Sequence, residues 1–330
     1  MQNTRLGKKK IKKKKIRWVR LFLAIFFLLL VGGGAYFYNV YTNVASAVDK
    51  MNKPISREVS TKRETKVEVE QKEPISILLV GVDERKGDKG RTDSMLVVTV
   101  NPEKKSTKMV SIPRDTRTKL INNQNPKKNH IDKINAGYAY GGIEETIDTV
   151  ENFLNVPIDY YIQVNMEGFK DIVDAVGGID VDNQYAFELD GVRLQKGPQH
   201  LNGTQALQYS RMRKADPRGD FGRAERQREV ISKIIQKGKS ISTLTKYDDI
   251  LAALEENIKT NLTLNDIIDI QKSYKNAAET IDKLEIAGEG KMINGGWYYI
   301  VEDETRQSLS DQLREHLGLN SEVVAKITTY

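Results

Sequence analysis

The sequence of 330 residues predicts an α/β sandwich around a central sheet, preceded by one membrane-spanning helix. Short apolar runs typical of buried strands alternate along the chain with segments that carry apolar residues at helical spacing, and this alternation is typical of α/β proteins. A separate segment, residues 21–48, contains no charged residue. That length is sufficient to cross a bilayer, which needs about 20 residues of helix.

Charge is distributed unevenly along the chain. There are 52 Lys+Arg and 45 Asp+Glu residues, a formal net charge of +7. Ten of the cations lie in residues 1–20, which contain no acid, so the rest of the chain has 42 basic and 45 acidic residues. A nucleic-acid-binding protein would need a basic folded domain, and this one is slightly acidic. The absence of cysteine excludes a disulfide scaffold, a Cys-ligated metal and a thiol nucleophile.

The N-terminal segments predict a membrane topology. We expect a basic cytoplasmic tail (residues 1–20), a transmembrane signal-anchor helix (21–42) and a charged, solvated extracellular tether (43–73). A cleaved signal peptide is the alternative, because Ala45-Ser46-Ala47 has the small residues of a cleavage site. That site lies 14 residues beyond Val31, the end of the continuous apolar run, which favours an uncleaved anchor. The prediction is a single-pass type II protein of the cell membrane with its folded domain outside.

The predicted domain, residues 74–320, begins with three strands and continues with mixed elements. The second and third strands are expected to form a hairpin. Residues 143–154 have an apolar stripe made by Ile143, Ile147, Val150 and Leu154. The expected elements are strands at 75–80, 94–100 and 108–112, a helix at 143–154, a strand at 160–164, helices at 169–176, 245–258 and 263–278, a strand at 297–301 and a helix at 304–317. Thr263, with Asp266 three residues later, marks the start of the helix at 263–278.

The segment 209–228 is unusually rich in arginine. It contains six arginines and one lysine, whereas the whole chain has 34 lysines and 18 arginines. Guanidinium groups bind phosphate oxygens bidentately, so this bias predicts an anion site. A helical pattern places Arg223 and Gln227 on the same face as the apolar residues that follow them. A guanidinium in line with a buried stripe needs a partner, either a ligand anion or a structural carboxylate such as Asp216 or Asp220.

Two aspartates, Asp83 and Asp93, flank the loop between the first two predicted strands. Carboxylates together with substrate phosphates are the usual ligands of Mg²⁺, although loop aspartates also cap turns. Arg114 and Lys133 add basic residues near the ends of other predicted elements. Common catalytic signatures are absent, and the three histidines, His130, His200 and His316, are expected at the surface.

Five motifs in order resemble the LytR-CpsA-Psr family. They are GVDER…GRTDSM, VSIPRDT, HIDKINAGYAYGG, VNMEGFKDIVDAVGGIDVD and LNGTQALQYSRMRKADPRGDFGRAERQ, and they extend over residues 77–235. The chain is most similar to members that attach teichoic acid or another secondary polymer to peptidoglycan in Gram-positive bacteria. The resemblance implies an α-β-α sandwich around a central mixed sheet.

The resemblance also implies an activity and a site. The implied enzyme is a Mg²⁺-dependent phosphotransferase that moves a glycopolymer from an undecaprenyl-diphosphate carrier to the C6 hydroxyl of N-acetylmuramic acid in peptidoglycan. Asp83 and Asp93 would hold the metal, and Asp93 would also be the general base. The implied diphosphate-binding residues are Arg91, Arg114, Lys133, Arg211, Arg213, Arg223 and Gln227, of which Arg91, Arg114 and Arg223 would also be catalytic. The family holds the polyprenyl chain in an apolar pocket, whose residues the sequence does not identify.

Three other functions are considered. A polyprenyl-diphosphate hydrolase could use the same site, with water in place of the acceptor. A non-catalytic adaptor could bind anionic wall polymer through the same arginines. A transcription regulator is disfavoured, because the twenty residues ahead of the predicted span contain no DNA-binding fold.

Overall fold

The computed structural model describes residues 13–83, 90, 92–238 and 254–327. The chain divides into two compact units, Met1–Ser46 and Ala47–Tyr330. The first unit contains most of helix α1, which runs from Lys13 to Met51. None of the helices in the described ranges combines the length and the apolar character that a membrane crossing demands.

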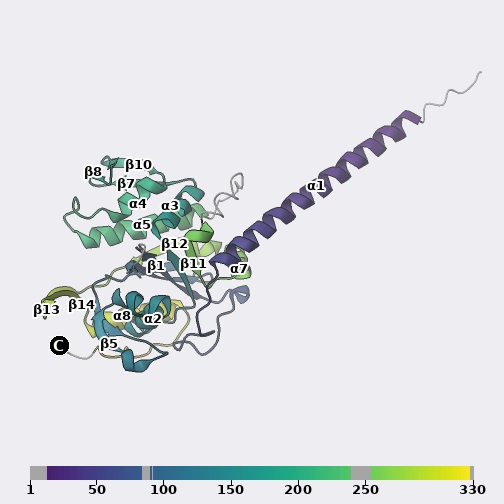
Figure 1. The fold of residues 1–330 in the computed structure, drawn as a ribbon. Coiled ribbons are helices and arrows are strands. Elements are labelled where there is room, and N and C mark those ends of the chain that lie inside the picture. The colour runs from purple at the N-terminus through teal and green to yellow at the C-terminus, as the bar shows by residue number, and fades with distance from the viewer. Residues whose placement is uncertain (1–12, 84–89, 91, 239–253, 328–330) are drawn as a thin grey trace, which may run out of the picture. The chain divides into compact units, whose positions relative to one another are not determined.

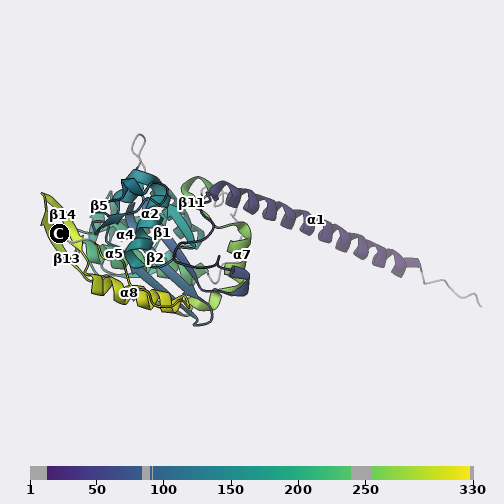
Figure 2. The ribbon, with the colours of Figure 1, turned by 90° about the horizontal axis from the view of Figure 1, so that it is seen from below.

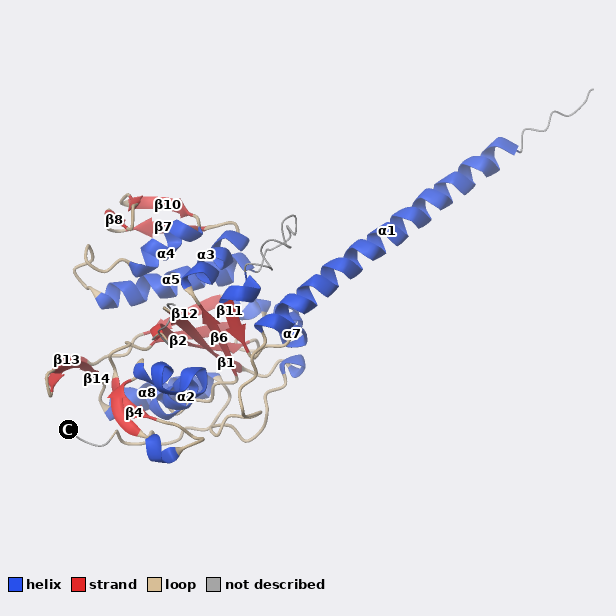
Figure 3. Cartoon of the chain, viewed as in Figure 1, coloured by secondary structure: helices blue, strands red, loops and turns tan. Residues whose placement is uncertain are grey.

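A six-stranded sheet forms the centre of the second unit (Figure 3). In spatial order its strands are β11 (Ile258–Thr260), β6 (Tyr160–Val164), β1 (Ile75–Val82), β2 (Thr92–Asn101), β3 (Ser106–Ser111) and β12 (Thr280–Leu284). The β6–β1 and β3–β12 pairs are parallel, and the other three are antiparallel. The sheet is therefore mixed, and the predicted α/β class is confirmed.

The predicted hairpin is formed by β2 and β3. Their register runs from Leu96 opposite Ser111 to Asn101 opposite Ser106. In the turn, the side-chain oxygen of Asn101 accepts a hydrogen bond from the backbone N–H of Lys104 at 2.8 Å. This bond closes the turn in the way that Asn residues commonly do.

Helices cover both faces of the sheet (Figures 1 and 3). The helices α2 (Ala136–Leu154) and α8 (Asp303–His316) lie on one face. The helices α3 (Met166–Ala175), α4 (Gly203–Arg211) and α5 (Asp220–Gly238) lie on the other. The stripe predicted on α2 is in place, because Ile147, Val150 and Leu154 are buried in the core that β1, β2 and α8 complete.

The remaining elements are short and lie around this sandwich. They are η1 (Val69–Gln71), β4 (Arg117–Leu120), η2 (Pro126–Lys128), β5 (His130–Lys133), β7 (Ile179–Asn183), β8 (Phe187–Leu189), β9 (Val192–Leu194), β10 (Gly197–Leu201), α7 (Leu264–Ser273), η3 (Lys275–Ala278), β13 (Glu289–Ile293) and β14 (Gly296–Ile300). The hairpin β13–β14 lies at the end of the domain opposite α7 (Figures 1 and 2).

Two predicted helices differ from the structure. Of the helix predicted at 245–258, residues 245–253 lie outside the described residues, residues 254–257 are helical as predicted, and Ile258 begins β11 instead. The helix predicted at 263–278 begins where expected, with Thr263 as N-cap in a capping box with Asp266. It ends early at Ser273, and the chain then tightens into the 3-10 turn η3.

The segment predicted as a solvated tether packs on the domain. The guanidinium of Arg57 forms an ion pair with Glu151 of α2 at 2.6 Å. Val67 and Val69 are buried in a cluster with residues of the central sheet. Two of the cations that suggested a solvated segment, Arg57 and Arg63, pair with Glu151 and Asp159, so this part of the predicted tether packs on the domain.

Candidate functional site

A cavity of about 1080 Å³ lies between the sheet and α5. Charged residues line one part of it, and most of the remaining lining is apolar. The apolar side chains come from both walls and include Leu79, Leu96 and Val98 of the sheet and Ile231, Ile234 and Ile235 of α5.

Strand alternation assigns the residues of β2 to two environments. Leu96, Val98 and Val100 face the cavity, whereas Met95 and Val97 belong to the core on the opposite face. The apolar residues of β2 therefore contribute alternately to the packed core on one face of the sheet and to the cavity wall on the other.

A β-bulge changes this alternation at Asp93. Gly81 of β1 is opposite Ser94, but the next residue, Val82, is opposite Thr92, so Asp93 is the extra residue. By strict alternation Asp93 would face the core with Met95. The bulge instead directs its carboxylate to the cavity, which it lines together with Asp83 at the end of β1.

Asp93 and Arg114 form the first charged pair of the site. Nη1 of Arg114 donates a hydrogen bond to Oδ1 of Asp93 at 2.8 Å, and both residues line the cavity. Burial opposes the charge of Arg114, but this hydrogen bond and the nearby carboxylates outweigh it and raise its pKa. Arg114 therefore stays cationic and holds the Asp93 side chain in one orientation.

Arg223 and Gln227 lie in the cavity, on the face that helical spacing predicted. Nη2 of Arg223 is 3.3 Å from Oδ1 of Asp220, and the hydroxyl of Ser94 donates to Oε1 of Gln227 at 3.3 Å. Asp220 is the structural carboxylate considered as the alternative partner, but its side chain is 45% exposed while that of Arg223 is 18% exposed. The cation is therefore more deeply buried than its carboxylate partner, so the charge of Arg223 is only partly neutralised.

The electrostatics of Arg223 favour an additional anion. Burial lowers its pKa, and the neighbouring cations Arg114 and Arg213 lower it further, against the opposing effect of Asp220 and Asp93. A guanidinium keeps its charge under these conditions. Bound phosphate would relieve the mutual repulsion of the three arginines, which makes this end of the cavity suitable for a phosphorylated ligand.

Arg211 and Arg213 also line the cavity. Arg211 forms an ion pair with Asp190 at 2.7 Å, and Arg213 lies 3.6 Å from Asp220. Asp220 is thus shared between Arg213 and Arg223. A phosphate at this end could replace Asp220 as the partner of either guanidinium.

One residue of the expected diphosphate site is placed differently. Lys133 is not among the residues that line the cavity. It pairs with Asp115 at 2.8 Å, and Asp115 in turn lies 3.5 Å from Nε of Arg114. Lys133 therefore supports Arg114 from behind. Arg91 lies outside the described residues.

Asp216, the other carboxylate considered as a partner of Arg223, instead forms a buried ion pair with Arg226, which the sequence did not predict. Arg226 of α5 donates to Asp216 at 2.6 Å and to the backbone oxygens of Tyr209 and Met212. Although burial opposes ionisation, hydrogen bonds from Arg218 and Arg226 lower the pKa of Asp216 to about 2. These contacts fix the loop that carries Arg213, so Arg226 is a positioning residue.

The histidines are not part of the site. None of the three lines the cavity. His130 and His200 are exposed, as predicted. His316 was also predicted at the surface, but it is buried. Its ring nitrogens lie 2.7 Å from the Thr99 hydroxyl and 2.9 Å from the Ser106 hydroxyl, which holds the end of α8 on the β2–β3 hairpin.

Asp83 and Asp93 could hold a metal ion only if a bound ligand supplied further oxygen donors. Among the described residues, no group of three or more His, Cys, Asp or Glu side chains could hold a metal ion. Asp83 and Asp93 provide two hard oxygen donors at the charged end of the cavity. That donor set fits Mg²⁺ if substrate phosphates supply further oxygens, which is how Mg²⁺ is commonly bound.

The fold and the site define a class: an α/β protein with a cavity for an amphipathic anion, cationic at one end and apolar beyond. The chain belongs to the LytR_cpsA_psr family, whose model matches residues 38–315.

Similar proteins extend this assignment. The polyisoprenyl-teichoic acid–peptidoglycan teichoic acid transferase TagU of Bacillus mycoides (strain KBAB4) is 49% identical over 94% of this chain and 99% of its own length. The crystal structure of B. subtilis TagU is 47% identical, with a TM-score of 0.59 over 74% of this chain and 97% of that chain. A structure of TagT bound to LIIa-WTA is 32% identical, with a TM-score of 0.69 over 81% of this chain and all of that chain.

Proposed function

We propose that this protein is a phosphotransferase that moves a teichoic acid or similar glycopolymer from an undecaprenyl-diphosphate carrier to the C6 hydroxyl of N-acetylmuramic acid in peptidoglycan. The observation that carries the proposal is the cavity, which joins an apolar wall to the Arg114, Arg213 and Arg223 cluster. A lipid diphosphate has the same division between an apolar chain and a dianionic head.

The apolar wall would bind the polyprenyl chain. Arg223, Gln227, Ile231 and Ile235 follow one another at successive turns of α5 and line the same cavity. At 1.5 Å per residue, Arg223 and Ile235 are separated by about 18 Å along the helix. The lipid chain would extend along this row, with its diphosphate beside Arg223.

The reaction is a displacement at phosphorus. The acceptor hydroxyl oxygen forms a bond to the phosphorus that carries the glycopolymer, the bond from that phosphorus to the bridging oxygen breaks, and polyprenyl phosphate leaves. Arg114, Arg213 and Arg223 stabilise the negative charge that develops on the phosphate oxygens. Such catalysis depends on positioning and electrostatics and needs no covalent nucleophile.

Asp93 would accept the proton of the acceptor hydroxyl. Its place at the bulge, held by Arg114, supports this role because the carboxylate faces the cavity in a defined orientation. Asp83 and Asp93 would hold Mg²⁺, which when bound would neutralise part of the diphosphate charge. Asp93 releases its proton to solvent after the transfer.

We further propose that residues 21–42 anchor the protein in the cell membrane, with the tail inside and the domain outside. The apolar run 21–31 and the ten cations before it support this topology. In the second unit Ala47 and Val48 are buried, so cleavage between them would cut a packed segment rather than a loose one. N-terminal sequencing of the mature protein is expected to give a chain that does not begin at Val48.

A transfer assay tests the proposed function. Full-length protein in detergent, supplied with a synthetic polyprenyl-diphosphate glycopolymer, Mg²⁺ and uncrosslinked peptidoglycan, is expected to join the polymer to the glycan covalently. Release of free polymer at the same rate with and without peptidoglycan would instead identify a hydrolase. Binding of polymer with no turnover of the lipid diphosphate would identify an adaptor, and either result would reject the transferase.

A further inference from the structure

One face of the hairpin β13–β14 carries aromatic residues, and its outer end is exposed to solvent. Met292 is directly opposite Trp297 and Gly290 is opposite Tyr299, so these four residues share one face of the hairpin. Trp297 is 45% exposed and Met292 is 63% exposed. Exposed large side chains gathered on one face are a common sign of a binding surface.

The indole of Trp297 lies flat on this face. A Cβ added to Gly290 would come within 2.8 Å of the indole Cζ2 and 2.9 Å of Nε1. The ring therefore packs over Gly290, which has no side chain in the way, while almost half of the Trp297 surface stays exposed. An aromatic ring supported beneath and open above is a preformed platform, which loses little conformational freedom when a ligand stacks on it.

The aromatic face continues to the phosphate end of the cavity. Tyr299 is buried and makes an edge-to-face contact with Phe221, with 5.8 Å between the ring centroids. Phe221 is 58% exposed and lies next to Asp220, the carboxylate that pairs with Arg223. The hairpin itself is attached near Arg114, because the Tyr299 N–H donates to the backbone oxygen of Asp115 at 2.9 Å.

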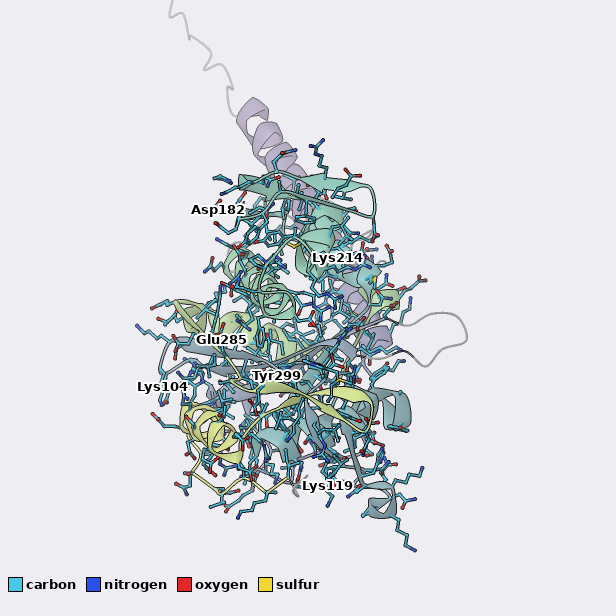
Figure 4. All side chains as sticks on the ribbon, turned by 90° about the vertical axis from the view of Figure 1, so that its left-hand side faces the viewer. Lys104, Lys119, Asp182, Lys214, Glu285 and Tyr299 are labelled. Atoms are coloured by element: carbon cyan, nitrogen blue, oxygen red, sulfur yellow. The ribbon has the colours of Figure 1, made fainter. Side chains whose placement is uncertain are left out.

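Figure 4 looks onto the side of the domain that carries this hairpin. The labelled Tyr299 lies near the centre of the view, and Lys214, which lines the cavity, lies above it. We call Met292, Trp297, Tyr299 and Phe221 the aromatic strip. It begins at the outer end of the hairpin and ends at the first turn of α5.

We propose that the aromatic strip binds the acceptor, a polysaccharide strand whose pyranose rings stack on Trp297 and Phe221. The proposal rests on the proposed function, which requires a sugar hydroxyl to reach the phosphorus near Arg223. Pyranose rings have apolar faces of C–H groups and polar edges, which match flat aromatic rings set in a polar surface. A strand lying along the strip would be led to the reacting phosphate.

The dimensions of the strip favour a polysaccharide over other occupants. Its exposed part consists of three side chains, far from the roughly 800 Å² per partner that a stable protein interface buries. On the hairpin, the cation Lys291 is opposite Tyr298 and so belongs to the other face, whereas binding to an anionic membrane surface usually uses a cluster of cations.

Fluorescence tests the proposal directly, because the chain has only two tryptophans, Trp18 and Trp297. In a Trp18→Phe background, the emission reports on Trp297 alone. We expect soluble, uncrosslinked glycan strands to shift this emission to shorter wavelength in a saturable manner, with full-length protein in detergent. No shift at any strand concentration would overturn the proposal. A shift caused instead by transfer into phosphatidylglycerol nanodiscs, or by raising protein concentration alone, would identify a membrane or a second copy as the occupant.

Substitutions separate stacking from folding. In titration calorimetry, which does not depend on Trp297 emission, Trp297→Ala and Gly290→Ala are each expected to weaken glycan binding about tenfold, the first by removing the ring and the second by tilting it. Ile268→Ala on α7, 45% exposed at the opposite end of the domain, is the matched control and should bind normally. Equal binding by all three variants would contradict the proposal.

The same variants distinguish this proposal from the proposed function. Affinity for the lipid-diphosphate donor should be unchanged in Trp297→Ala, while the KM for peptidoglycan rises about tenfold. If no variant and no wild-type protein transfers polymer, the proposed function fails, but the fluorescence result still decides whether the strip binds glycan. If transfer occurs with an unchanged KM, only the aromatic strip is rejected.

Discussion

Arg223 is a largely buried cation at the charged end of the cavity. Its side chain is largely buried, it shares Asp220 with Arg213, and Arg114 is close enough to lower its pKa. A buried cation with an incomplete set of anionic partners is costly unless a ligand completes the set. Burial of the Arg223 cation therefore lowers the stability of the ligand-free protein, and the proposed phosphate ligand would offset this loss.

Replacing Arg223 should weaken donor binding. We expect Arg223→Ala to reduce affinity for a polyprenyl diphosphate about tenfold to a hundredfold, because a charge-assisted hydrogen bond contributes about 1.5–3 kcal/mol. Arg193→Ala, an exposed arginine on β9 that does not line the cavity, is the matched control. Titration calorimetry in detergent measures both. Wild-type affinity in the Arg223 variant would argue against the phosphate site.

The ion pair of Asp216 and Arg226 should stabilise the fold as well as the site. Asp216→Asn leaves the buried Arg226 without its counter-ion, which should lower the free energy of unfolding by about 3–5 kcal/mol. Asp190→Asn breaks the exposed pair with Arg211 and should cost less than about 1 kcal/mol. Denaturant titration compares the two, and similar losses would show that burial of the pair is not decisive.

At the scale of elements, the end of α8 is attached to the β2–β3 hairpin through a neutral histidine. Burial, together with the nearby Lys108 and Lys104, lowers the pKa of His316 to about 4. The unfolded chain binds this proton with an ordinary pKa near 6.5, so unfolding takes up a proton between these two values. The contribution of His316 to stability is therefore complete above pH 6.5 and is lost as the pH falls toward 4.

This contribution predicts a pH dependence that a substitution removes. Between pH 6.5 and 4, the free energy of unfolding should fall by up to about 1.4 kcal/mol per pH unit from His316 alone. The His316→Asn variant should be less stable at neutral pH and should show a smaller slope in this range. Denaturant titrations at several pH values measure the difference. Parallel curves for the two proteins would mean that His316 is not held neutral.

The bulge in β2 determines which carboxylate lines the cavity. It moves one carboxylate, Asp93, from the face of the packed core to the face of the cavity. Next to the bulge, Gly81 of β1 is opposite Ser94, and a Cβ added to Gly81 would come within 3.2 Å of the Ser94 Cβ. The close approach of the two strands at this point allows Asp93 and Asp83 to line the same end of the cavity.

At the scale of the whole molecule, the cavity sets the length of ligand that the domain can hold. Ile231 lies two turns beyond Arg223 on α5, about 12 Å along the helix. We expect Ile231→Trp to block the cavity at that depth, so that a long polyprenyl diphosphate binds weakly while a short-chain one binds as in wild type. Ile231→Leu conserves volume and is the control. Equal loss for both chain lengths would place the lipid elsewhere.

Sequence periodicity predicted much of this arrangement because it operates within single elements. The stripe on α2, the β2–β3 hairpin and the cavity face of Arg223 and Gln227 all follow from spacing along one helix or strand. The position of Lys133 behind Arg114 depends on how β5 pairs with β4, which no local pattern reveals.

Other features required contacts between distant segments. The bulge at Asp93 depends on pairing with β1, and the burial of Arg226 depends on a loop that folds back over α5. His316 looked like a surface residue because its partners, Thr99 and Ser106, are more than two hundred positions away. Residues 52–73 resembled a solvated tether because the partners of Arg57 and Arg63, Glu151 and Asp159, lie about ninety positions away in the sequence.

In the proposed function, one cavity binds the lipid chain and its diphosphate together. The most direct test is a crystal structure of the full-length protein with a polyprenyl diphosphate. We predict electron density for the chain between β2 and α5, beside Val98 and Ile231, with phosphate oxygens within hydrogen-bond distance of Arg223. Phosphates bound away from Arg114, Arg213 and Arg223, or a chain outside the cavity, would contradict the claim.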